Sequence, residues 1–381
     1  MMKKIIYILN VDWFFVSHRL PIAIKAIESG YEVHLACSFT GQREYLESLG
    51  IICHNIDFSR SNVSLRGEIK AISKIRNLIK YISPDLVHAV TIKPVLYSGL
   101  VLQTFRTPPS FVAAISGLGY VFTASSLRAK FTRYFVSMLY KWALRGKSKL
   151  VVFQNTSDLK ILRNIVDLSN NETVLIKGSG ADLSLYKQSS EPKTNTKIIS
   201  MACRLIKEKG VYEFVESARI VKTIMPETYF WLIGNTDEGN PNSVKQNEID
   251  NWVDEGIISA LGQRNDIAEL FSKSHIVTMP SFYGEGVPKV LIEAAACGRP
   301  IITTDKPGCR DAIVDKETGL LVPEQDSKAL ADALMLLLKD DDTRQKMGIK
   351  AREFAVKEFD VQSVVSKHLT IYKNLLNPGI K

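Results

Sequence analysis

The 381-residue chain lacks several features that would place it in simpler classes of protein. No run approaches the roughly 20 consecutive apolar residues that cross a bilayer, so a membrane-spanning helix is not expected. The five cysteines form no C-x-x-C pair and the six histidines show no H-x-H or H-x3-H spacing, so neither a disulfide framework nor a zinc site is predicted. With 45% hydrophobic and 23% charged residues, the composition is that of a globular protein. The odd number of cysteines is typical of reduced thiols, as in the cytosol.

Acidic residues are scarce in the first half of the chain. Residues 1–190 carry 24 basic and 12 acidic side chains, whereas residues 191–381 carry 25 and 28. This imbalance favours contact between the first half and an anionic partner, although lysine-rich solvated surfaces would give the same count. Nucleic acid is not the expected partner, because no RNP, helix-turn-helix or zinc-finger pattern is present.

Short apolar segments alternate with amphipathic ones, which is typical of parallel sheets covered by helices on both faces. In the first half we predict strands at 4–9, 32–36, 51–56, 84–89, 111–115, 150–154 and 173–176. After an aperiodic stretch at 183–196, we predict strands at 197–202, 228–233, 276–279, 300–303 and 319–322. The sequence therefore predicts two doubly wound α/β domains, residues 1–190 and 191–360, with a last helix in 361–381 that packs back on the first domain.

The most informative segment covers residues 281–300 and contains Glu285 and Glu293. Glycines on both sides of Glu285 allow a tight turn, and Pro288 suits the first turn of a helix whose free N–H groups would face a phosphate. Carboxylates repel phosphate, so we expect both to accept hydrogen bonds from sugar hydroxyls. Glu285 would bind a transferred hexose, and Glu293 would bind a ribose diol.

A second segment supplies positive charge close to these carboxylates. Arg204 and Lys209 follow the strand predicted at 197–202, and both could reach a diphosphate on the predicted helix start. Cations in that position would stabilise the charge that develops on a leaving group. A solvated basic loop is the alternative interpretation of these two residues.

The ordered set of segments resembles that of retaining family-4 glycosyltransferases. Glu285 and Glu293 match the E-x7-E signature of that family, and Arg204 with Lys209-Gly210 matches its R…K-G pair. The similarity continues through 230–234, 261–266, 308–311 and 319–323. In the first half, 17–21, 115–122 and 154–155 are similar to bacterial members that build lipid-linked surface polysaccharides and glycans. Together these matches span almost the whole chain.

The resemblance implies the GT-B fold, in which two Rossmann-like domains face each other across a cleft and the second holds most of the donor. It implies catalytic roles for Glu285, Arg204 and Lys209. The implied donor-binding residues are Gly234, Gly262, Gln263, Arg264, Gly286, Val287, Pro288 and Glu293. The expected acceptor-binding residues are Ser17, His18, Arg19, Gly117, Gly119 and Asn155, with His18 on a loop after the first strand. Residues 11–15 replace a glycine pair that many relatives carry.

These observations predict a retaining glycosyltransferase that moves a hexose or N-acetylhexosamine from a nucleotide sugar, with UDP expected, to a polyprenyl-diphosphate-linked saccharide. Such a reaction belongs to the biosynthesis of surface polysaccharide, O-antigen, capsule or glycan. No cofactor and no metal ion are expected. Two alternatives remain open: a nucleotide-sugar 2-epimerase on the same scaffold, and a non-catalytic scaffold of a polysaccharide assembly complex.

Residues 127–150 combine basic and aromatic side chains, a composition that suits the surface of an anionic bilayer. The alternative is an ordinary amphipathic helix whose aromatic face belongs to the core. The first interpretation predicts a cytoplasmic protein bound peripherally to the inner face of the plasma membrane. The residues concerned are Arg128, Lys130, Arg133, Lys141, Arg145, Lys147 and Lys149, with Phe131, Tyr134, Phe135, Leu139, Tyr140 and Trp142, and a possible extension through Arg60, Ser61, Arg66, Lys70, Lys74, Arg76 and Lys80.

Overall fold

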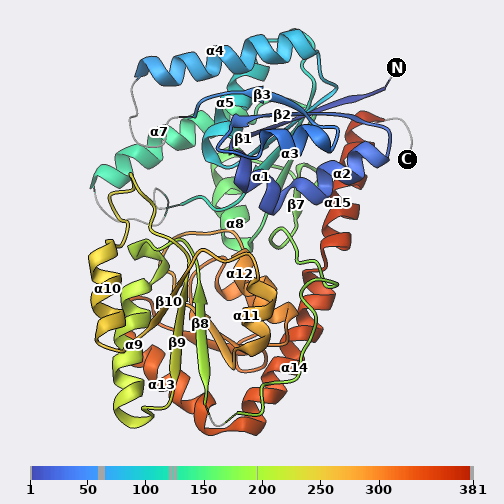
Figure 1. Ribbon diagram of the computed structural model, residues 1–381. Coiled ribbons are helices and arrows are strands. Elements are labelled where there is room, and N and C mark those ends of the chain that lie inside the picture. The colour runs from blue at the N-terminus through green and yellow to red at the C-terminus, as the bar shows by residue number, and fades with distance from the viewer. Residues whose placement is uncertain (1, 59–64, 120–121, 123–126, 195, 378–381) are drawn as a thin grey trace. The chain divides into compact units, whose positions relative to one another are not determined.

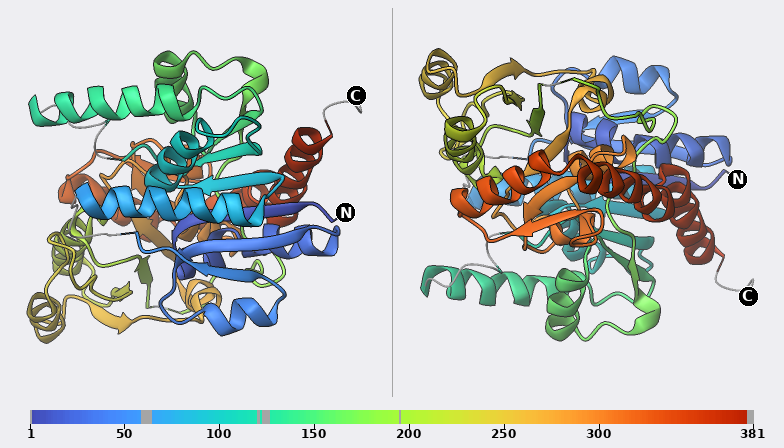
Figure 2. Two further views of the ribbon diagram at one scale, coloured as in Figure 1. Left: turned by 90° about the horizontal axis from the view of Figure 1, so that it is seen from above. Right: turned by 90° about the horizontal axis from the view of Figure 1, so that it is seen from below.

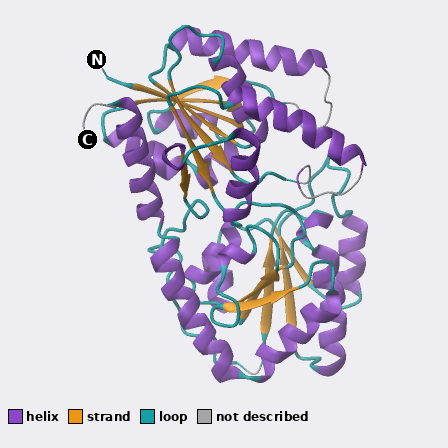
Figure 3. Cartoon of the chain, turned by 180° about the vertical axis from the view of Figure 1, so that it is seen from behind, coloured by secondary structure: helices purple, strands orange, loops and turns teal. Residues whose placement is uncertain are grey.

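The computed structural model describes residues 2–58, 65–119, 122, 127–194 and 196–377 (Figure 1). The chain divides into two compact units. Unit 1 comprises Met1–Ser179 and Val361–Lys381, and unit 2 comprises Gly180–Asp360. In each unit, helices lie on both sides of a single sheet (Figure 3).

The sheet of unit 1 has the strand order β3-β2-β1-β4-β5-β6-β7, and its neighbouring strands pair in parallel. Parallel strands need long crossovers, and the helical segments between them supply these. The strands lie where the alternating sequence pattern predicts them, with ends shifted by a few residues. They are β1 Lys4–Val11, β2 Glu32–Ser38, β3 Ile52–Asn55, β4 Leu86–Val90, β5 Ser110–Ile115, β6 Lys149–Phe153 and β7 Thr173–Leu175.

Alternation along β1 explains why unit 1 has a core on each face of its sheet. Ile6 and Ile8 belong to one buried cluster, whereas Ile5 and Tyr7 belong to another, because successive side chains of a strand point to opposite faces. The helices that contribute to the first cluster are α4 Leu65–Ile82, α5 Ile92–Leu102, α7 Leu127–Ala143 and α8 Thr156–Val166. Those that contribute to the second are α1 Asp12–His18, α2 Leu20–Glu28, α3 Arg43–Ser48 and α15 Val361–Leu376; a short 3-10 helix, η1, covers Asn170–Glu172.

Helix α15 packs on unit 1 although it lies at the other end of the chain (Figure 2). Its Tyr372 hydroxyl lies 2.9 Å from the Tyr7 hydroxyl of β1 and 2.6 Å from His88 Nδ1 of β4. All three side chains are completely buried. Buried polar groups must find partners, so these hydrogen bonds specify where α15 seats on the sheet.

Residues 180–190 belong to unit 2, so the chain divides between Ser179 and Gly180 instead of after residue 190. Hydrogen bonds explain the difference. The Ala181 N–H donates to the Phe359 carbonyl over 2.8 Å, and Arg299 Nη2 donates to Ser189 Oγ over 2.5 Å. Such contacts between distant residues leave no periodic pattern in the sequence, and the segment therefore looks like a linker.

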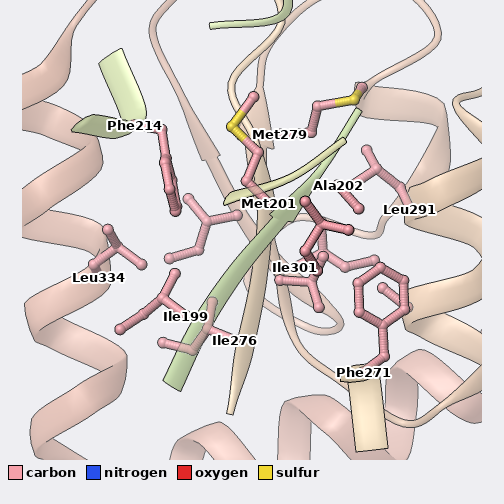
Figure 4. Close-up of a cluster of buried hydrophobic side chains, with 14 of the residues drawn as sticks. Ile199, Met201, Ala202, Phe214, Phe271, Ile276, Met279, Leu291, Ile301 and Leu334 are labelled. Atoms are coloured by element: carbon pink, nitrogen blue, oxygen red, sulfur yellow. The ribbon is translucent and has the colours of Figure 1, made fainter. Parts of the chain in front are cut away.

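The sheet of unit 2 has the order β10-β9-β8-β11-β12-β13, again with parallel pairing. Its strands are β8 Ile198–Ala202, β9 Tyr229–Ile233, β10 Ser259–Gly262, β11 Ile276–Met279, β12 Ile301–Thr304 and β13 Gly319–Val322. Its helices are α9 Val211–Ile224, α10 Gln246–Asp254, α11 Ile267–Lys273, α12 Lys289–Ala296, α13 Ser327–Lys339 and α14 Asp341–Glu358, with 3-10 helices η2 Lys207–Lys209 and η3 Arg310–Ala312. Phe214 and Leu334 lie on one side of the central strands, and Phe271 and Leu291 lie on the other (Figure 4).

Helix α1 and strand β10 are among the elements that were not predicted from the sequence. Helix α1 replaces the loop expected after the first strand, and β10 is a short edge strand of four residues. Neither segment has a periodic pattern long enough to identify it, because α1 runs directly out of β1 and β10 contains Gly262. None of the helices in the described part of the chain combines the length and the apolar character needed to span a bilayer.

Candidate active site

The strand order of unit 2 reverses between β8 and β11, and this position organises the candidate site. In open α/β sheets, ligands bind outside the carboxyl ends of the strands at such a switch point. Arg204 and Lys209 follow β8, and the segment that carries Glu285 follows β11. The fold therefore brings together two charged segments that lie far apart in the sequence.

Gly210 allows the two segments to approach closely. It has φ +82°, and a Cβ at this position would lie 2.2 Å from the carbonyl oxygen of Pro280, the residue after β11. No other residue fits this position without moving the backbone. Lys209, the residue before Gly210, is the last residue of η2. It is therefore held close to the loop that follows β11.

Lys209 and Glu285 form an ion pair in which Lys209 Nζ lies 2.5 Å from Glu285 Oε2. The second carboxylate oxygen accepts a hydrogen bond of 2.6 Å from the Ser281 hydroxyl. The side chains of Lys209 and Glu285 are only 15% and 13% exposed, so water screens their charges little. The carboxylate is fixed as a hydrogen-bond acceptor, and the ammonium is placed where it can stabilise an anion.

Arg204 is more accessible than Lys209. Its side chain is half-exposed, and its Nη1 lies 2.8 Å from Asp237 Oδ2. A surface pair of this kind contributes little to stability, so the guanidinium can exchange partners at low cost. The structure thus places the expected diphosphate-binding cations, Arg204 and Lys209, at one end of the sheet.

Gly286, Val287 and Pro288 are buried in the loop that leads into α12. Pro288 stands at the N-cap of this helix and not inside its first turn. Gly308 packs against the same loop: its φ is +86°, and a Cβ there would lie 2.0 Å from the Gly286 carbonyl oxygen and 2.5 Å from that of Glu285. Gly308 belongs to the matching segment 308–311, but only the packing shows that it supports the Glu285 loop.

Glu293 lies on α12 and is buried, with 7% of the residue exposed. Burial raises the pKa of its carboxyl, while Lys289 and a hydrogen bond from the Tyr186 hydroxyl act in the opposite direction. Lys289 Nζ lies 3.4 Å from Glu293 Oε1. Sequence reasoning missed Tyr186, because it belongs to the aperiodic stretch that resembles a linker.

The remaining expected donor residues follow β9 and β10. The Gly234 N–H donates to the Gly262 carbonyl over 2.8 Å, and a Cβ on Gly234 would lie 1.9 Å from the carbonyl oxygen of Cys203. The Gln263 N–H donates to Asn235 Oδ1 over 3.0 Å, while Arg264 pairs with Asp266. The ends of β8, β9 and β10 therefore meet at Gly234, where only glycine fits. The side chains of Gln263 and Arg264 next to this place are exposed.

The expected acceptor residues near the start of the chain have mixed environments. Ser17 and His18 are the last residues of helix α1, so the prediction that His18 lies on a loop is wrong. The His18 ring stacks on the Phe14 ring, with their centroids 4.1 Å apart. The Arg19 side chain is 2% exposed, and burial lowers its pKa to about 10. The guanidinium therefore lies inside unit 1, where its Nη1 donates to the His18 carbonyl.

Gly117, Gly119 and Asn155 follow β5 and β6. The two glycines have φ of 105° and 68°, which other residues seldom adopt. Asn155 is buried at the N-cap of α8, where its side-chain oxygen accepts from the Asp158 N–H over 2.8 Å. Capping the N-terminus of α8 is a structural role that explains why an asparagine stands at position 155. The neighbouring Tyr120, part of the matching segment 115–122, lies outside the described residues.

Family comparisons divide the chain in nearly the same way as the structure. Residues 184–354 match the family described as glycosyl transferases group 1, and residues 4–155 match the family described as glycosyl transferase 4-like. The first match contains the candidate site of unit 2. The second contains the expected acceptor residues of unit 1, with Asn155 at its last position.

Similar proteins cover nearly the whole chain. The N,N'-diacetylbacillosaminyl-diphospho-undecaprenol alpha-1,3-N-acetylgalactosaminyltransferase of Campylobacter jejuni is 28% identical, over 94% of this chain and 95% of that protein. The UDP-Gal:alpha-D-GlcNAc-diphosphoundecaprenol alpha-1,3-galactosyltransferase of Escherichia coli is 23% identical, over 91% and 90%. The crystal structure of Anabaena Alr3699/HepE in complex with UDP superposes with a TM-score of 0.77 at 18% identity, over 98% of this chain and 100% of that one.

The two α/β units thus have the GT-B architecture predicted from the sequence. Arg204, Lys209 and Glu285 follow the carboxyl ends of β8 and β11, and Glu293 lies on α12. Glycosyltransferase family models match residues 4–155 in unit 1 and residues 184–354 in unit 2. The chain belongs to the glycosyltransferases, with a group 1 segment in unit 2 and a 4-like segment in unit 1.

Proposed function

We propose that the chain transfers a hexose or N-acetylhexosamine from a nucleotide sugar, preferentially a UDP-sugar, to a polyprenyl-diphosphate-linked saccharide with retention of anomeric configuration. The observation that carries the proposal is the Lys209–Glu285 pair at the switch point of unit 2, with Arg204 beside it in the sequence. Two similar proteins named for diphosphoundecaprenol-linked acceptors, and a similar structure titled as a UDP complex, support the substrate class.

In the proposed reaction the donor diphosphate binds Arg204 and Lys209, and Glu285 accepts a hydrogen bond from the transferred sugar. The acceptor hydroxyl oxygen forms a bond to the anomeric carbon on the face from which the diphosphate departs. The bond from that carbon to the diphosphate oxygen breaks, and the hydroxyl proton passes to this oxygen. The two cations stabilise the charge that develops on the leaving group, which is the main role of such preorganised groups.

Transfer assays test the proposal. UDP-, GDP- and dTDP-sugars are incubated with a polyprenyl-diphosphate-linked N-acetylhexosamine, and the product is identified by mass spectrometry and its anomeric configuration by NMR. A product one sugar longer with the configuration of the donor is expected, and its yield should not change with a metal chelator. An inverted linkage would contradict the retaining mechanism, and chelator sensitivity would contradict metal independence.

The same assays distinguish the two alternative functions. A 2-epimerase would convert the donor to its epimer with no acceptor present. A non-catalytic scaffold would bind no nucleotide sugar in calorimetry. Either result, obtained together with an absence of transfer, would overturn the proposed activity.

We further propose that unit 1 binds peripherally to the anionic inner face of the cytoplasmic membrane through helix α7. Five large apolar side chains on this helix are between 40% and 68% exposed, at positions that share one helical face: Phe131, Tyr134, Phe135, Met138 and Trp142. The opposite face carries Tyr140 and Ala143, which are buried in the core. The aromatic side chains therefore form an outer stripe, which is unusual for a helix in water.

Positive charge on the same segment of the chain supports an anionic bilayer as the partner of the stripe. Arg133, Lys141, Arg145 and Lys147 lie on or just after α7, and residues 101–150 contain no acidic side chain. Basic and aromatic side chains together suit the headgroup region of anionic lipid. The side chains of Arg128 and Lys130, and the whole of Arg60 and Ser61, lie outside the described part of the chain.

Replacing Phe131 and Trp142 together with serine should weaken binding to vesicles that contain anionic phosphatidylglycerol about tenfold or more, because two exposed rings no longer enter the interface. Co-sedimentation measures this, with Leu336→Ser in unit 2, also an exposed apolar side chain, as the matched control. Binding should fall in high salt and with pure phosphatidylcholine. Unchanged binding would overturn the membrane assignment. So would analytical ultracentrifugation in which the wild-type chain is a dimer and the same variant a monomer, because the stripe would then join two copies of the chain.

A further inference from the structure

The strand order of unit 1 reverses between β1 and β4, so this unit has a switch point of its own. Ligands of open parallel sheets bind outside the strand ends at such a position. The two strand ends are joined there, because Asn10 Nδ2 of β1 donates to Thr91 Oγ1, the residue after β4, over 3.1 Å. Helix α1 begins immediately after β1 and occupies this end of the sheet.

Asp12 fixes the start of α1. One carboxylate oxygen accepts a hydrogen bond from the backbone N–H of Trp13 over 2.8 Å and another from the Thr40 hydroxyl over 2.6 Å. The other accepts from the backbone N–H groups of Thr40 and Gln42 over 2.7 Å and 2.9 Å. Burial opposes ionisation, but these hydrogen bonds lower the pKa of the Asp12 carboxyl overall, so it is charged and rigidly held at neutral pH.

Three rings follow on this fixed helix start. The Trp13 and Phe14 centroids lie 6.1 Å apart at 73°, and the Phe14 and His18 rings stack 4.1 Å apart at 10°. Trp13 is nevertheless 39% exposed. An indole held in place and open to solvent at a switch point is suited to a ligand that has both an apolar face and polar groups.

We propose that Trp13, supported by Phe14 and His18, is the platform on which the pyranose ring of the acceptor saccharide packs. A pyranose has an apolar face of C–H groups that covers an aromatic ring, while its hydroxyls remain free to hydrogen-bond around the rim. The cations and carboxylates assigned to the donor lie in unit 2, whereas Trp13 lies at the separate switch point of unit 1. The assignment rests on the proposed function and adds a specificity residue for the acceptor sugar.

Direct binding tests the platform without requiring catalysis. The probes are farnesyl diphosphate and farnesyl-diphosphate-linked N-acetylglucosamine, which share the lipid and the diphosphate and of which only the second carries a sugar. The variants are Trp13→Ala and Trp13→Phe, with Tyr81→Ala as the matched control, since Tyr81 is an aromatic residue of α4 that is 84% exposed. Kd values come from calorimetry, and tryptophan fluorescence reports contact with the indole.

Trp13→Ala should weaken binding of the sugar-bearing probe about tenfold, which corresponds to about 1.4 kcal/mol, and leave farnesyl diphosphate unaffected. Trp13→Phe, which keeps an aromatic ring, should recover much of the loss and fold normally. The Kd of UDP should not change in either variant. In the transfer assay the acceptor KM should rise while kcat changes little.

Equal loss for both probes would place the lipid diphosphate and not the sugar on Trp13, and a weakened UDP Kd would place the donor there. Either outcome overturns the platform. If the wild-type chain transfers sugar and Trp13→Ala keeps its acceptor KM, the platform fails and the proposed function stands. If the wild-type chain transfers no sugar although the probe binds and depends on Trp13, the proposed function fails and the platform stands.

Discussion

Replacing Glu285 with glutamine is expected to lower the rate of sugar transfer at least about a hundredfold, a typical cost of removing one preorganised polar group from an active site. Glutamine has nearly the same shape but no charge. It therefore loses the ion pair to Lys209 Nζ, 2.5 Å away, and presents a weaker acceptor to the sugar hydroxyl. The measurement is kcat and KM for donor and acceptor, with thermal melting to verify folding.

Lys209→Met provides the complementary test, because it removes the charge that faces the donor diphosphate and should also reduce kcat strongly. The matched control is Glu269→Gln, which breaks an exposed Glu269–Lys273 pair on α11 in the same unit. Exposed pairs of this type contribute about 0–1 kcal/mol to stability, so activity and melting should stay unchanged. Near-normal turnover in both Glu285→Gln and Lys209→Met would refute the assigned roles.

Gly308→Ala is expected to disturb the same site from the far side of its loop. The added methyl would lie 2.0 Å from the Gly286 carbonyl oxygen and 2.5 Å from that of Glu285, so the loop has to move. We expect a loss of about 1–3 kcal/mol in the free energy of unfolding from the backbone strain, and a larger proportional loss of kcat as Glu285 shifts. Urea denaturation and transfer assays measure the two effects.

Gly239→Ala is the matched control for this substitution. Gly239 has φ +85°, almost the same as the +86° of Gly308, but a Cβ there meets nothing within 4 Å. The backbone cost of alanine is therefore shared, and any additional loss in Gly308→Ala comes from the contact with the Glu285 loop. Equal stability and equal activity in the two variants would show that Gly308 does not support the loop.

Local patterns explain what could be predicted. Strand positions followed from short apolar segments, because a strand buried on both faces is apolar along its whole length. The candidate site in unit 2 was predicted from Glu285, Glu293, Arg204 and Lys209. Glycines, a proline and charged residues at fixed spacing can be recognised in the sequence without knowledge of the fold. Their convergence was an expectation, and the strand order β10-β9-β8-β11-β12-β13 provides its physical basis.

Other features had no local signal. Tyr186 reaches Glu293 from a stretch without periodicity. Gly308 acts through backbone contacts with Glu285 and Gly286, which are distant in the sequence and adjacent in space. Arg19 resembles an exposed binding residue in the sequence, yet it is buried between α15 and the sheet, beside Tyr7 and Tyr372. Burial depends on which segments pack together, and α15 comes from the opposite end of the chain.

The sequence by itself determined that this chain folds as two parallel α/β units and carries glycosyltransferase signatures, because periodicity and motif spacing are properties of adjacent residues. It also showed that acidic residues are absent from 101–150, but it left two interpretations of the aromatic residues there. Tertiary structure decided which of these side chains are exposed, since the core takes one face of α7 and leaves Phe131 and Trp142 in solvent. It likewise decided the exposure of Trp13, because which side of an element faces water depends on the packing of the whole unit.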